Sequence, residues 1–221
     1  MPGRPPRATS RRRRAAAPRR RVRLELDARR AQLLAIGRAI FSERAYDDVS
    51  VDELARAAGI SKGLLYHYFP TKRDLYVAGL RATAAELIDR TGAIDRTQPP
   101  IDRVRAGLDA FLDHVSAHAP GFIALMRGGV GSDPEIAEII ADTRAQLIER
   151  MLRDAGATPL GAVAHRPIFR IALRSWIGAV EAASIDWLAT RDCPRTDLRE
   201  LLVALLIATL TAAGAPATSW R

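Results

Sequence analysis

The segment from residue 51 to 75, VDELARAAGISKGLLYHYFPTKRDL, constrains the fold more than any other part of this sequence. Ser50 and Glu53 form an S-x-x-E pattern, which predicts a capping box at the start of a helix. Gly59 tolerates left-handed backbone angles and is placed to end that helix, while Ser61 is placed to cap the next one. The segment therefore predicts two short helices joined by a tight turn.

A third helix is expected directly after the second. Pro70 ends the second helix, because a proline restricts the backbone of the residue before it. Thr71 then follows as a new N-cap, with Asp74 at the third helical position. A helix, a turn containing glycine and a second helix rich in hydrogen-bonding side chains is the arrangement that enters a DNA major groove. The pattern predicts a helix-turn-helix head that binds DNA.

These residues closely resemble the DNA-binding domain of the TetR family of bacterial transcriptional repressors. The resemblance is strong from about residue 31 to 80, and its most specific segment is LLYHYFPTKRDL. The rest of the chain resembles the family only in length, in its helical pattern and in its C-terminal tryptophans. Two positions depart from the family pattern: Ala45 stands where glycine is usual, and Leu64 stands where threonine is frequent.

The resemblance implies a set of DNA-contacting residues. Tyr66, Tyr68 and Lys72 match positions that touch phosphates, and tyrosine hydroxyls and lysine amines are suitable phosphate donors. Lys62, Gly63 and His67 match positions that contact base edges or the adjacent backbone. The alternative is that a tyrosine only packs in the small head. The full expected set is Ser50, Ser61, Lys62, Gly63, Leu65, Tyr66, His67, Tyr68 and Lys72.

Positive charge is concentrated at the N-terminus. The net charge is +9, but residues 1–23 hold ten arginines and no acidic residue, which leaves 24 basic and 25 acidic residues elsewhere. We expect residues 1–25 to form a disordered arm that binds nucleic acid through its charge. The Gly3-Arg4-Pro5 segment resembles the centre of an AT-hook, which inserts an arginine in the minor groove. A plain basic tail is the simpler alternative, and we favour it.

Beyond the arm, residues 26–75 are expected to form the head and residues 76–221 a larger helical body. Amphipathic stripes predict one helix that leaves the head and five further helices, and no segment alternates long enough for a strand. Asp133-Pro134 and Pro167 mark two helix starts, while Gly128–Gly131 is expected to be a turn. The predicted fold is all-α, with a three-helix head joined to a ligand-binding and dimerisation body.

The body has more apolar stripes than a dimerisation module needs, which predicts a cavity for an apolar or amphipathic effector. Arg127, Arg144 and His114 could add polar groups, although a solvated face is the simpler interpretation of the two arginines. His114 and His118 have a spacing that could hold a metal ion, but a third ligand is not evident and we predict none. The expected lining is Phe111, His114, Val115, Phe122, Met126, Leu147, Met151, Phe169 and Trp176.

The last two helices are expected to form a homodimer interface. Their tryptophans and aliphatic residues resemble the dimer-forming helices of the family, although the same residues could instead close the core of one protomer. The stretch from residue 201 to 220 is uncharged and long enough to span a membrane. Its polar residues favour a buried contact helix instead. The expected interface is Ile177, Val180, Ile185, Trp187, Leu188, Leu202, Leu205 and Leu206.

Other functional classes leave few traces in the sequence. No nucleophile, zinc-protease or dinucleotide motif is present, so an enzyme is not expected. Cys193 is the only cysteine, which excludes a disulfide within the chain and fits a reducing cytoplasm. The arginines near the N-terminus are followed by no apolar stretch, so a secretory signal is not expected, whereas a transit peptide stays open.

We therefore expect a cytoplasmic homodimeric regulator without a cofactor, most simply a repressor, that binds a palindromic operator and is released by a small molecule. Two other classes stay open. One is an architectural or activating DNA-binding protein whose body only dimerises. The other is an enzyme fused to a helix-turn-helix head, which would need titratable groups clustered in its cavity.

Overall fold

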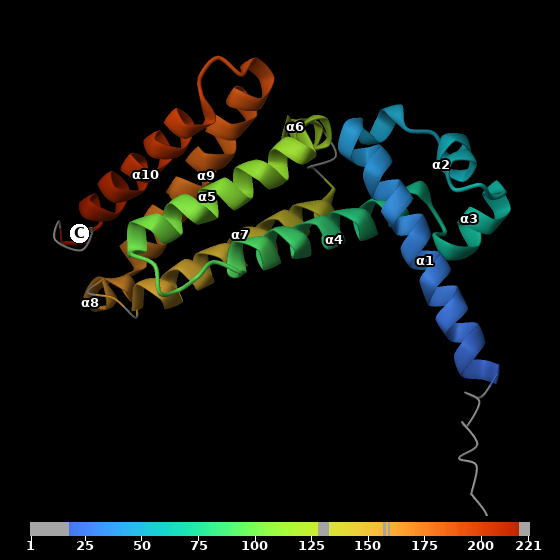
Figure 1. Cartoon of the computed structure of the whole chain (residues 1–221), viewed down its shortest axis with the longest axis horizontal. Coiled ribbons are helices and arrows are strands. Elements are labelled where there is room, and N and C mark those ends of the chain that lie inside the picture. The colour runs from blue at the N-terminus through green and yellow to red at the C-terminus, as the bar shows by residue number, and fades with distance from the viewer. Residues whose placement is uncertain (1–17, 128–132, 157, 159, 217–221) are drawn as a thin grey trace, which may run out of the picture.

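The computed structural model describes residues 18–127, 133–156, 158 and 160–216, and in these residues every regular element is helical. Two groups of helices lie at opposite ends of an elongated molecule (Figure 1). The head contains α1 (Pro18–Glu43), a short 3-10 turn η1 (Tyr46–Asp48), α2 (Val51–Ala57) and α3 (Lys62–Tyr68). The body contains α5 (Pro100–Ala117), α6 (Ala119–Arg127), α7 (Pro134–Gly156), α8 (Gly161–Ala164), α9 (Pro167–Thr190) and α10 (Arg195–Ala212). The helix α4 (Lys72–Gly92) joins the two groups.

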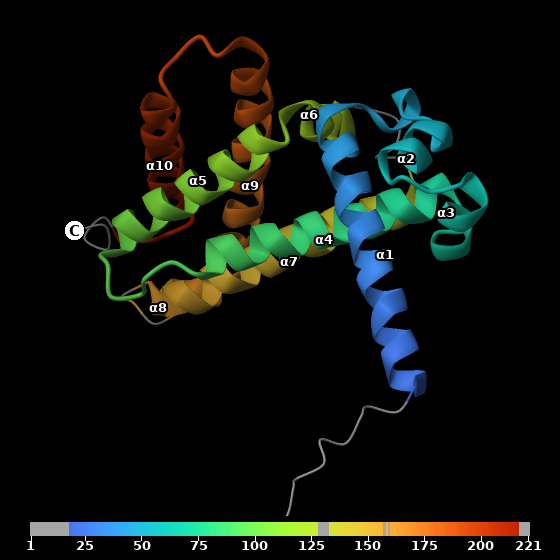
Figure 2. The same cartoon turned by 45° about the vertical axis from the view of Figure 1, so that its right-hand side comes forward.

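The first helix is longer than the sequence pattern suggested. It begins at Pro18 and not near Asp27, so the expected disordered arm is wrong for residues 18–25. Proline suits a first helical position, arginine is a good helix former, and neither glycine nor proline interrupts residues 19–36. The N-terminal part of α1 projects beyond the rest of the head (Figure 2). The Gly3-Arg4-Pro5 segment lies outside the described residues.

The head packs around its own apolar cluster. Leu33 and Phe41 of α1, Leu54 of α2, Leu65 of α3 and Phe69 are each no more than 6% exposed. Burial of such side chains contributes about 1.5–3 kcal/mol each. This small core fixes α3 against α1 and α2, and so fixes the face that α3 presents to solvent.

Local capping in the head follows the sequence pattern with one correction. The Ser50 hydroxyl accepts a hydrogen bond from the Glu53 backbone N–H at 3.1 Å, but the Glu53 carboxylate pairs with Arg44, so that capping box is only half formed. Ser61 caps α3 by accepting from Leu64 N–H at 3.2 Å. Gly59 has φ +65°, the left-handed conformation that the turn requires.

The helix α4, which follows α3 after Thr71, continues unbroken from the head into the body. Thr71 and Asp74 form a reciprocal capping box at its start, as predicted. The helix then runs to Gly92, so the expected boundary after residue 75 falls within it. In Figures 1 and 2, α4 lies beside α7 along the length of the body.

Two further contacts join the head to the body. Ile136 and Ile139 of α7 are buried in the head cluster. Gly121 of α6 packs so closely on α1 that an added Cβ would lie 2.3 Å from the carbonyl oxygen of Phe41. No side chain larger than hydrogen fits there without a shift of the backbone. The end of α1 and the start of α6 are therefore in direct backbone contact.

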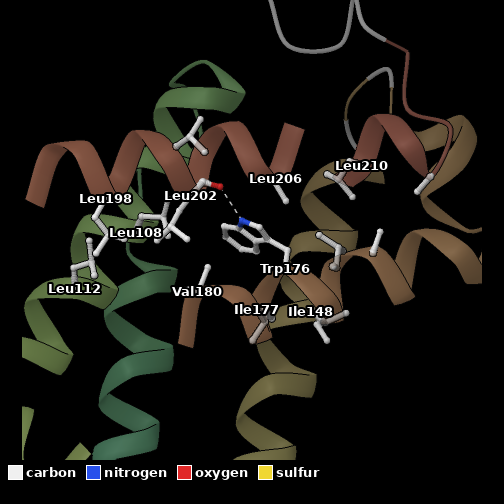
Figure 3. Close-up of a cluster of buried hydrophobic side chains, with 14 of the residues drawn as sticks. Leu108, Leu112, Ile148, Trp176, Ile177, Val180, Leu198, Leu202, Leu206 and Leu210 are labelled. Carbon is white, nitrogen blue, oxygen red and sulfur yellow. Dashed lines mark hydrogen bonds between the residues drawn. The ribbon is translucent and has the colours of Figure 1, made fainter. Parts of the chain in front are cut away.

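The body has a second, larger apolar cluster. Trp176 lies at its centre and donates a hydrogen bond from Nε1 to the Leu202 carbonyl at 2.9 Å (Figure 3). Leu202 and Leu206 of α10 lie beside the indole, and Leu108 of α5 belongs to the same cluster. The buried indole N–H thus has a partner, and α9 is held against α10.

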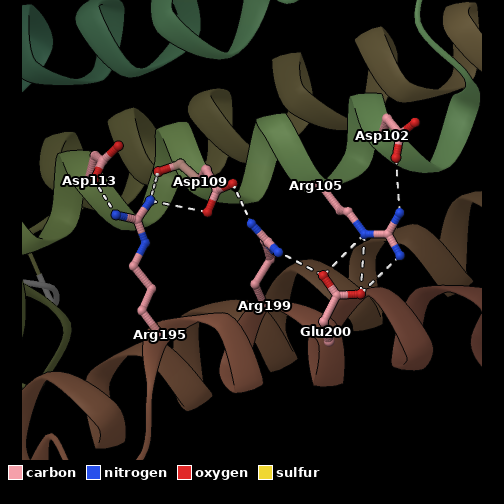
Figure 4. Close-up of polar contacts among 7 residues, drawn as sticks. All are labelled: Asp102, Arg105, Asp109, Asp113, Arg195, Arg199 and Glu200. Carbon is pink, nitrogen blue, oxygen red and sulfur yellow. Dashed lines mark hydrogen bonds and ion pairs between the residues drawn. The ribbon is translucent and has the colours of Figure 1, made fainter.

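Ion pairs hold α10 to α5 beside this core (Figure 4). Arg195 pairs with Asp109 and Asp113, and Arg199 also pairs with Asp109. Glu200 accepts hydrogen bonds from Arg105 at 3.0–3.2 Å. Half-exposed pairs of this kind contribute little individually, but a connected set fixes the register of two helices. The side of α10 that carries these residues therefore packs against α5 of the same chain.

The helices expected in the body are present, and α8 and η1 are additions that the sequence pattern did not reveal. The expected turn at Gly128–Gly131 lies outside the described residues. Of the helices described, none combines the length and apolar character that a membrane crossing requires.

Candidate DNA-contacting face, cavity and outer helix faces

The helix α3 presents a polar face to solvent. Lys62, Gly63 and His67 are exposed, and Tyr66 is 43% exposed. Tyr68 is half-buried, with its ring centroid 5.4 Å from that of His67. A helix that presents a lysine, a histidine and two tyrosines offers donors for phosphates and base edges.

Leu65 does not belong to this face. It is 4% exposed and packs in the head core, so its expected side-chain contact with DNA is wrong. The helical period explains this, because one position in each turn of a short helix must face its neighbours. The residue positions α3 and offers no surface to a ligand.

Two groups near the start of α3 are free of packing demands. A Cβ added to Gly63 would come no closer than 4.0 Å to Ser61 Oγ, so the fold itself does not require glycine there. The Lys62 amine pairs with Asp52 at 2.6 Å, with both side chains more than half exposed. An exposed pair is weak, so another anion can take the place of Asp52.

Lys72 has a second role that the sequence did not reveal. Its amine donates hydrogen bonds to the carbonyl oxygens of Tyr46 at 2.9 Å and Val49 at 3.0 Å. It also lies 4.0 Å from the centre of the Tyr46 ring. An ammonium group has three donors, so one remains for a phosphate. Lys72 therefore holds the η1 turn whether or not it also contacts DNA.

The body contains a cavity of about 320 Å³. All nine residues expected to line it do so, and they come from α5, α6, α7 and α9. The sequence reasoning missed the contribution of α4 and α10 to the walls, which include Leu80, Ala84, Leu87, Leu206 and Leu210. A cavity of this size, enclosed mostly by apolar side chains, is typical of small-molecule sites.

Polar side chains at the cavity wall are mostly paired. Arg144 makes two hydrogen bonds to Glu181, at 2.6 and 2.8 Å. Arg103 pairs with Asp154 at 2.9 Å near the end of the body farthest from the head. Arg127, which the sequence also suggested, is exposed and is not part of the lining. The two pairs neutralise Arg103 and Arg144, while Arg96 and Arg150 also line the cavity.

His114 is the exception among these polar groups. It is 5% exposed, and its Nδ1 has no hydrogen-bond partner among the described residues. Its ring centroid lies 5.3 Å from that of His118, whose Nδ1 also has no partner. Burial, and then the charge of His118, lower the pKa of His114 to about 4. Within the described residues, no third histidine, cysteine or carboxylate joins them in a group that could hold a metal ion.

The expected dimer residues mostly lie inside the chain. Ile177, Val180, Trp187, Leu188, Leu202 and Leu206 are each no more than 8% exposed and belong to the body core. Their assignment to a free face is therefore corrected. Ile185 is half-buried and Leu205 is 37% exposed, so these two remain accessible.

Other apolar residues form the outer faces of α9 and α10, which lie at the end of the body away from the head (Figure 1). On α9, Ile171 is 58% exposed and is followed at steps of three or four by Ser175, Gly178, Ala182 and Ile185. On α10, Leu201 is 62% exposed and is followed by Ala204, Leu205 and Ala208. These outer faces could have been found in the sequence, because small and apolar residues recur at steps of three or four next to the residues that face the core.

Two family descriptions match the sequence. "Bacterial regulatory proteins, tetR family" matches residues 33–78, and "Tetracyclin repressor-like, C-terminal domain" matches residues 100–209. The first match covers residues 33–43 of α1, all of α2 and α3 and the first part of α4, and the second covers α5 to α9 and most of α10. One description thus matches the head and the other matches the body.

Individual relatives agree with these matches. The chain is 33% identical over 120 residues to the HTH-type transcriptional activator FasR of Mycolicibacterium smegmatis, covering 54% of this chain and 55% of that protein. It thus spans only about half the length of FasR. It is 30% identical over 161 residues to the HTH-type transcriptional regulator EthR of Mycobacterium tuberculosis, covering 66% of this chain and 72% of EthR.

A solved structure of a tetR-family transcriptional regulator from Streptomyces coelicolor is similar along most of the fold. The two chains superpose with a TM-score of 0.77 and are 34% identical, and the match covers 85% of this chain and 82% of the other. The likeness therefore extends over both the head and the body.

Proposed function

The chain belongs to the TetR family of DNA-binding transcriptional regulators, which are not enzymes, and on that premise we propose that it is a homodimeric repressor released from its operator by a small apolar or amphipathic molecule. The observation that carries the effector half of this proposal is the cavity of about 320 Å³ between α4 and α9. A body that only joined two heads would gain stability by filling that space.

The DNA half of the proposal rests on α3. Lys62 and Gly63 stand at its exposed N-terminal end, which is the end that meets base edges in helix-turn-helix proteins. Tyr66 and His67 follow on the exposed surface and can hold phosphates or base edges. Ser50 and Ser61 are exposed N-caps beside them, close to the same expected backbone.

The dimer half rests on the outer faces of α9 and α10. Among the described residues of the body, Ile171 and Leu201 are the most exposed large apolar side chains, and small residues beside them let two helix pairs approach closely. In a two-fold dimer each face meets its own copy. The two α3 helices then bind half-sites about 34–36 Å apart, so the operator is palindromic.

Coupling between the cavity and DNA runs through the contacts between body and head. Phe122 and Met126 of α6 line the cavity, and Gly121 of the same helix packs on α1. A ligand that binds best when α6 is displaced therefore favours a different position of α1. The effect on DNA equals the difference in the ligand's affinity for the two shapes.

The experiment has two stages. Bound fragments are selected from genomic DNA to define the operator, and compounds are then screened for release of that operator. A compound that releases DNA should also raise the melting temperature, because it binds the folded protein. A reporter gene behind the operator distinguishes repression from activation, since repression predicts expression only with the compound.

A filled cavity supplies the control. Phe111→Trp adds volume at the cavity wall while leaving α3 unchanged. The variant should bind the operator normally and fail to release it. If release is unchanged in this variant, or if no compound in a broad apolar library binds, the body is a dimerisation module and the effector half of the proposal is wrong.

A further inference from the structure

The polar groups around the cavity are largely satisfied by the protein itself. Arg150 donates from Nη1 to the Ile88 carbonyl at 2.7 Å and to Thr91 Oγ1 at 3.1 Å. The hydroxyls of Thr143 and Thr158 each donate to a backbone carbonyl of their own helix region, at 2.7 and 2.8 Å. These side chains have partners before any ligand arrives, so a ligand gains little from them.

His114 differs from every other described side chain of the lining. It alone combines a place at the wall with a buried polar atom that has no hydrogen-bond partner. A buried, unpaired polar group costs about 1–3 kcal/mol. The His114 ring lines the cavity, but its Nδ1 has almost no accessible surface, so this nitrogen gains a hydrogen bond from a ligand when the imidazole turns toward the cavity.

The surroundings of His114 place this hydrogen bond at the end of the cavity near the head. Phe111, on the same helix one turn earlier, meets Phe122 of α6 edge to face, with ring centroids 6.3 Å apart. On the α4 side, Thr83 Oγ1 lines the cavity and accepts a hydrogen bond from Arg38 Nε of α1 at 3.2 Å. His114 therefore lines the same cavity as Phe122 of α6, the helix that contacts the head, and as Thr83, which accepts a hydrogen bond from Arg38 of the head.

The charges that act on this histidine do not make it a cation. Glu86 faces it together with Arg38 and Arg90, and both arginines pair with Glu86, at 2.6 and 2.7 Å. Burial lowers the pKa of His114 to about 4, so the ring is neutral at pH 7. A neutral imidazole offers one donor and one acceptor and no charge to balance an anion.

We propose that His114 forms the hydrogen bond that recognises an uncharged polar group, a hydroxyl or a carbonyl, on an otherwise apolar effector. The inference rests on the proposed effector function and names the ligand class of that cavity. The effector is then a neutral amphiphile of the alcohol, ketone or ester type, with its polar group toward α6. A ligand with a carboxylate would leave that charge uncompensated beside His114.

The opposing arrangement is an anionic amphiphile held at the far end of the cavity. Arg103 and Arg150 line that end, where Asp154 is the acidic partner of Arg103. Residues 103 and 114 are about 16 Å apart along α5, so one small polar group cannot meet both ends. The two arrangements therefore predict different ligands and different sensitive residues.

The test uses three probes of equal chain length with the full-length chain at pH 7.5: 1-decanol, decanoate and 1-decene. Binding is followed by the shift in melting temperature and by calorimetry. We expect 1-decanol to bind more tightly than both other probes. His114→Leu should weaken 1-decanol about fivefold to tenfold, as for one lost hydrogen bond, and leave 1-decene unchanged.

Two further variants separate recognition from structure. His114→Gln keeps an uncharged donor and acceptor and should restore part of the preference for 1-decanol. Ser184→Ala removes another buried polar group without a partner, on α9 and outside the cavity lining, and should leave all three probes unchanged. A purely structural role for His114 would instead change the three probes alike.

The proposal is overturned if 1-decanol and 1-decene bind equally, if decanoate binds most tightly and keeps that rank in His114→Leu, or if none of the three probes binds. Operator release is measured in the same samples with a compound from the screen. If the screened compound still releases the operator while these three probes do not bind, only the proposed ligand class is wrong. Loss of any ligand-dependent release would remove the effector function itself.

Discussion

The head and the body are both built from helices, but they fill their interiors to different extents. In the described part of the head, the crevice between α2, α3 and the start of α4 has no room for a water molecule. The body contains a cavity of about 320 Å³, and His114 at its wall has a buried Nδ1 without a hydrogen-bond partner among the described residues. The two regions have distinct apolar clusters and share α4.

This difference follows from what each region has to do. Recognition of DNA requires that α3 keep one position relative to α1 and α2, and a filled core with capped helix ends provides that. A response to a ligand requires two arrangements of similar energy, and space between helices allows them. The close contact of Gly121 with α1 then joins an adaptable region to a fixed one.

The largest expected effect concerns the exposed apolar face of α10, on the outer surface of the body. Leu205→Asp places a charge on the exposed face of α10, where the account requires a second copy. We expect a monomer and operator affinity about 100-fold lower or worse, because each head then binds alone. Sedimentation and operator titration measure both. Gln146→Asp, which adds the same charge at an exposed site on α7, should do neither. A fully dimeric Leu205→Asp would move the interface elsewhere.

The next effect tests what Lys72 contributes to the stability of the head. Lys72→Met removes two hydrogen bonds to carbonyls of the η1 turn and should cost about 2–3 kcal/mol of unfolding free energy. Lys62→Met removes only an exposed ion pair and should cost less than about 1 kcal/mol. Denaturation and salt-dependent DNA titration separate stability from phosphate contact, which changes the salt slope by about one per lysine. Equal stability of the two variants would contradict the role assigned to Lys72.

Much of the head could be predicted because its signals are local. Gly59, Ser61 and the Thr71–Asp74 pair act within a few residues of themselves, and each is placed as expected. The carbonyl contacts of Lys72 could not be predicted, since they join residues more than twenty positions apart. Likewise, arginine-rich composition alone did not reveal that α1 starts at Pro18.

The orientation of the amphipathic helices in the body could be predicted, but that of helices with more than one apolar face could not. Phe111 and Met151 line the cavity because a single amphipathic stripe must face inward. On α9 the residues are apolar almost all round, so the sequence could not decide whether Val180 or Gly178 faces the core. Six of the eight residues expected at the interface are buried in the body core, and only Ile185 and Leu205 are accessible, so most of the expected interface lies inside the chain.

A smaller effect concerns pH and arises in the body, where His114 is buried. The pKa of His114 is near 6.5 in the unfolded chain and about 4 in the folded body, so the unfolded chain takes up a proton first. Stability is therefore complete above pH 6.5 and falls as the pH drops toward 4, by about 2 kcal/mol at pH 5. His118, whose pKa is also lowered, acts in the same direction. Thermal unfolding of His114→Leu should show a flatter profile between pH 7 and 5, and an unchanged profile would contradict the buried neutral state.

The smallest effect tests the surface of α3. Gly63→Ala adds a methyl group in open space and should stabilise the helix by up to about 1 kcal/mol, while operator affinity falls about fivefold. Gly156→Ala adds the same methyl in open space at the end of α7 and should leave DNA binding unchanged. An unaffected operator affinity in Gly63→Ala would place DNA away from the start of α3.

The central claim is that occupancy of the body cavity and binding of DNA by the head are linked through one change of shape. The most direct test measures the affinity of a releasing compound with and without saturating operator. Linkage requires that the operator weaken the compound by the same factor by which the compound weakens the operator. Equal factors well above one are the predicted result, with both reduced to one in Phe111→Trp. A compound that binds the cavity with the same affinity in both conditions would contradict the account.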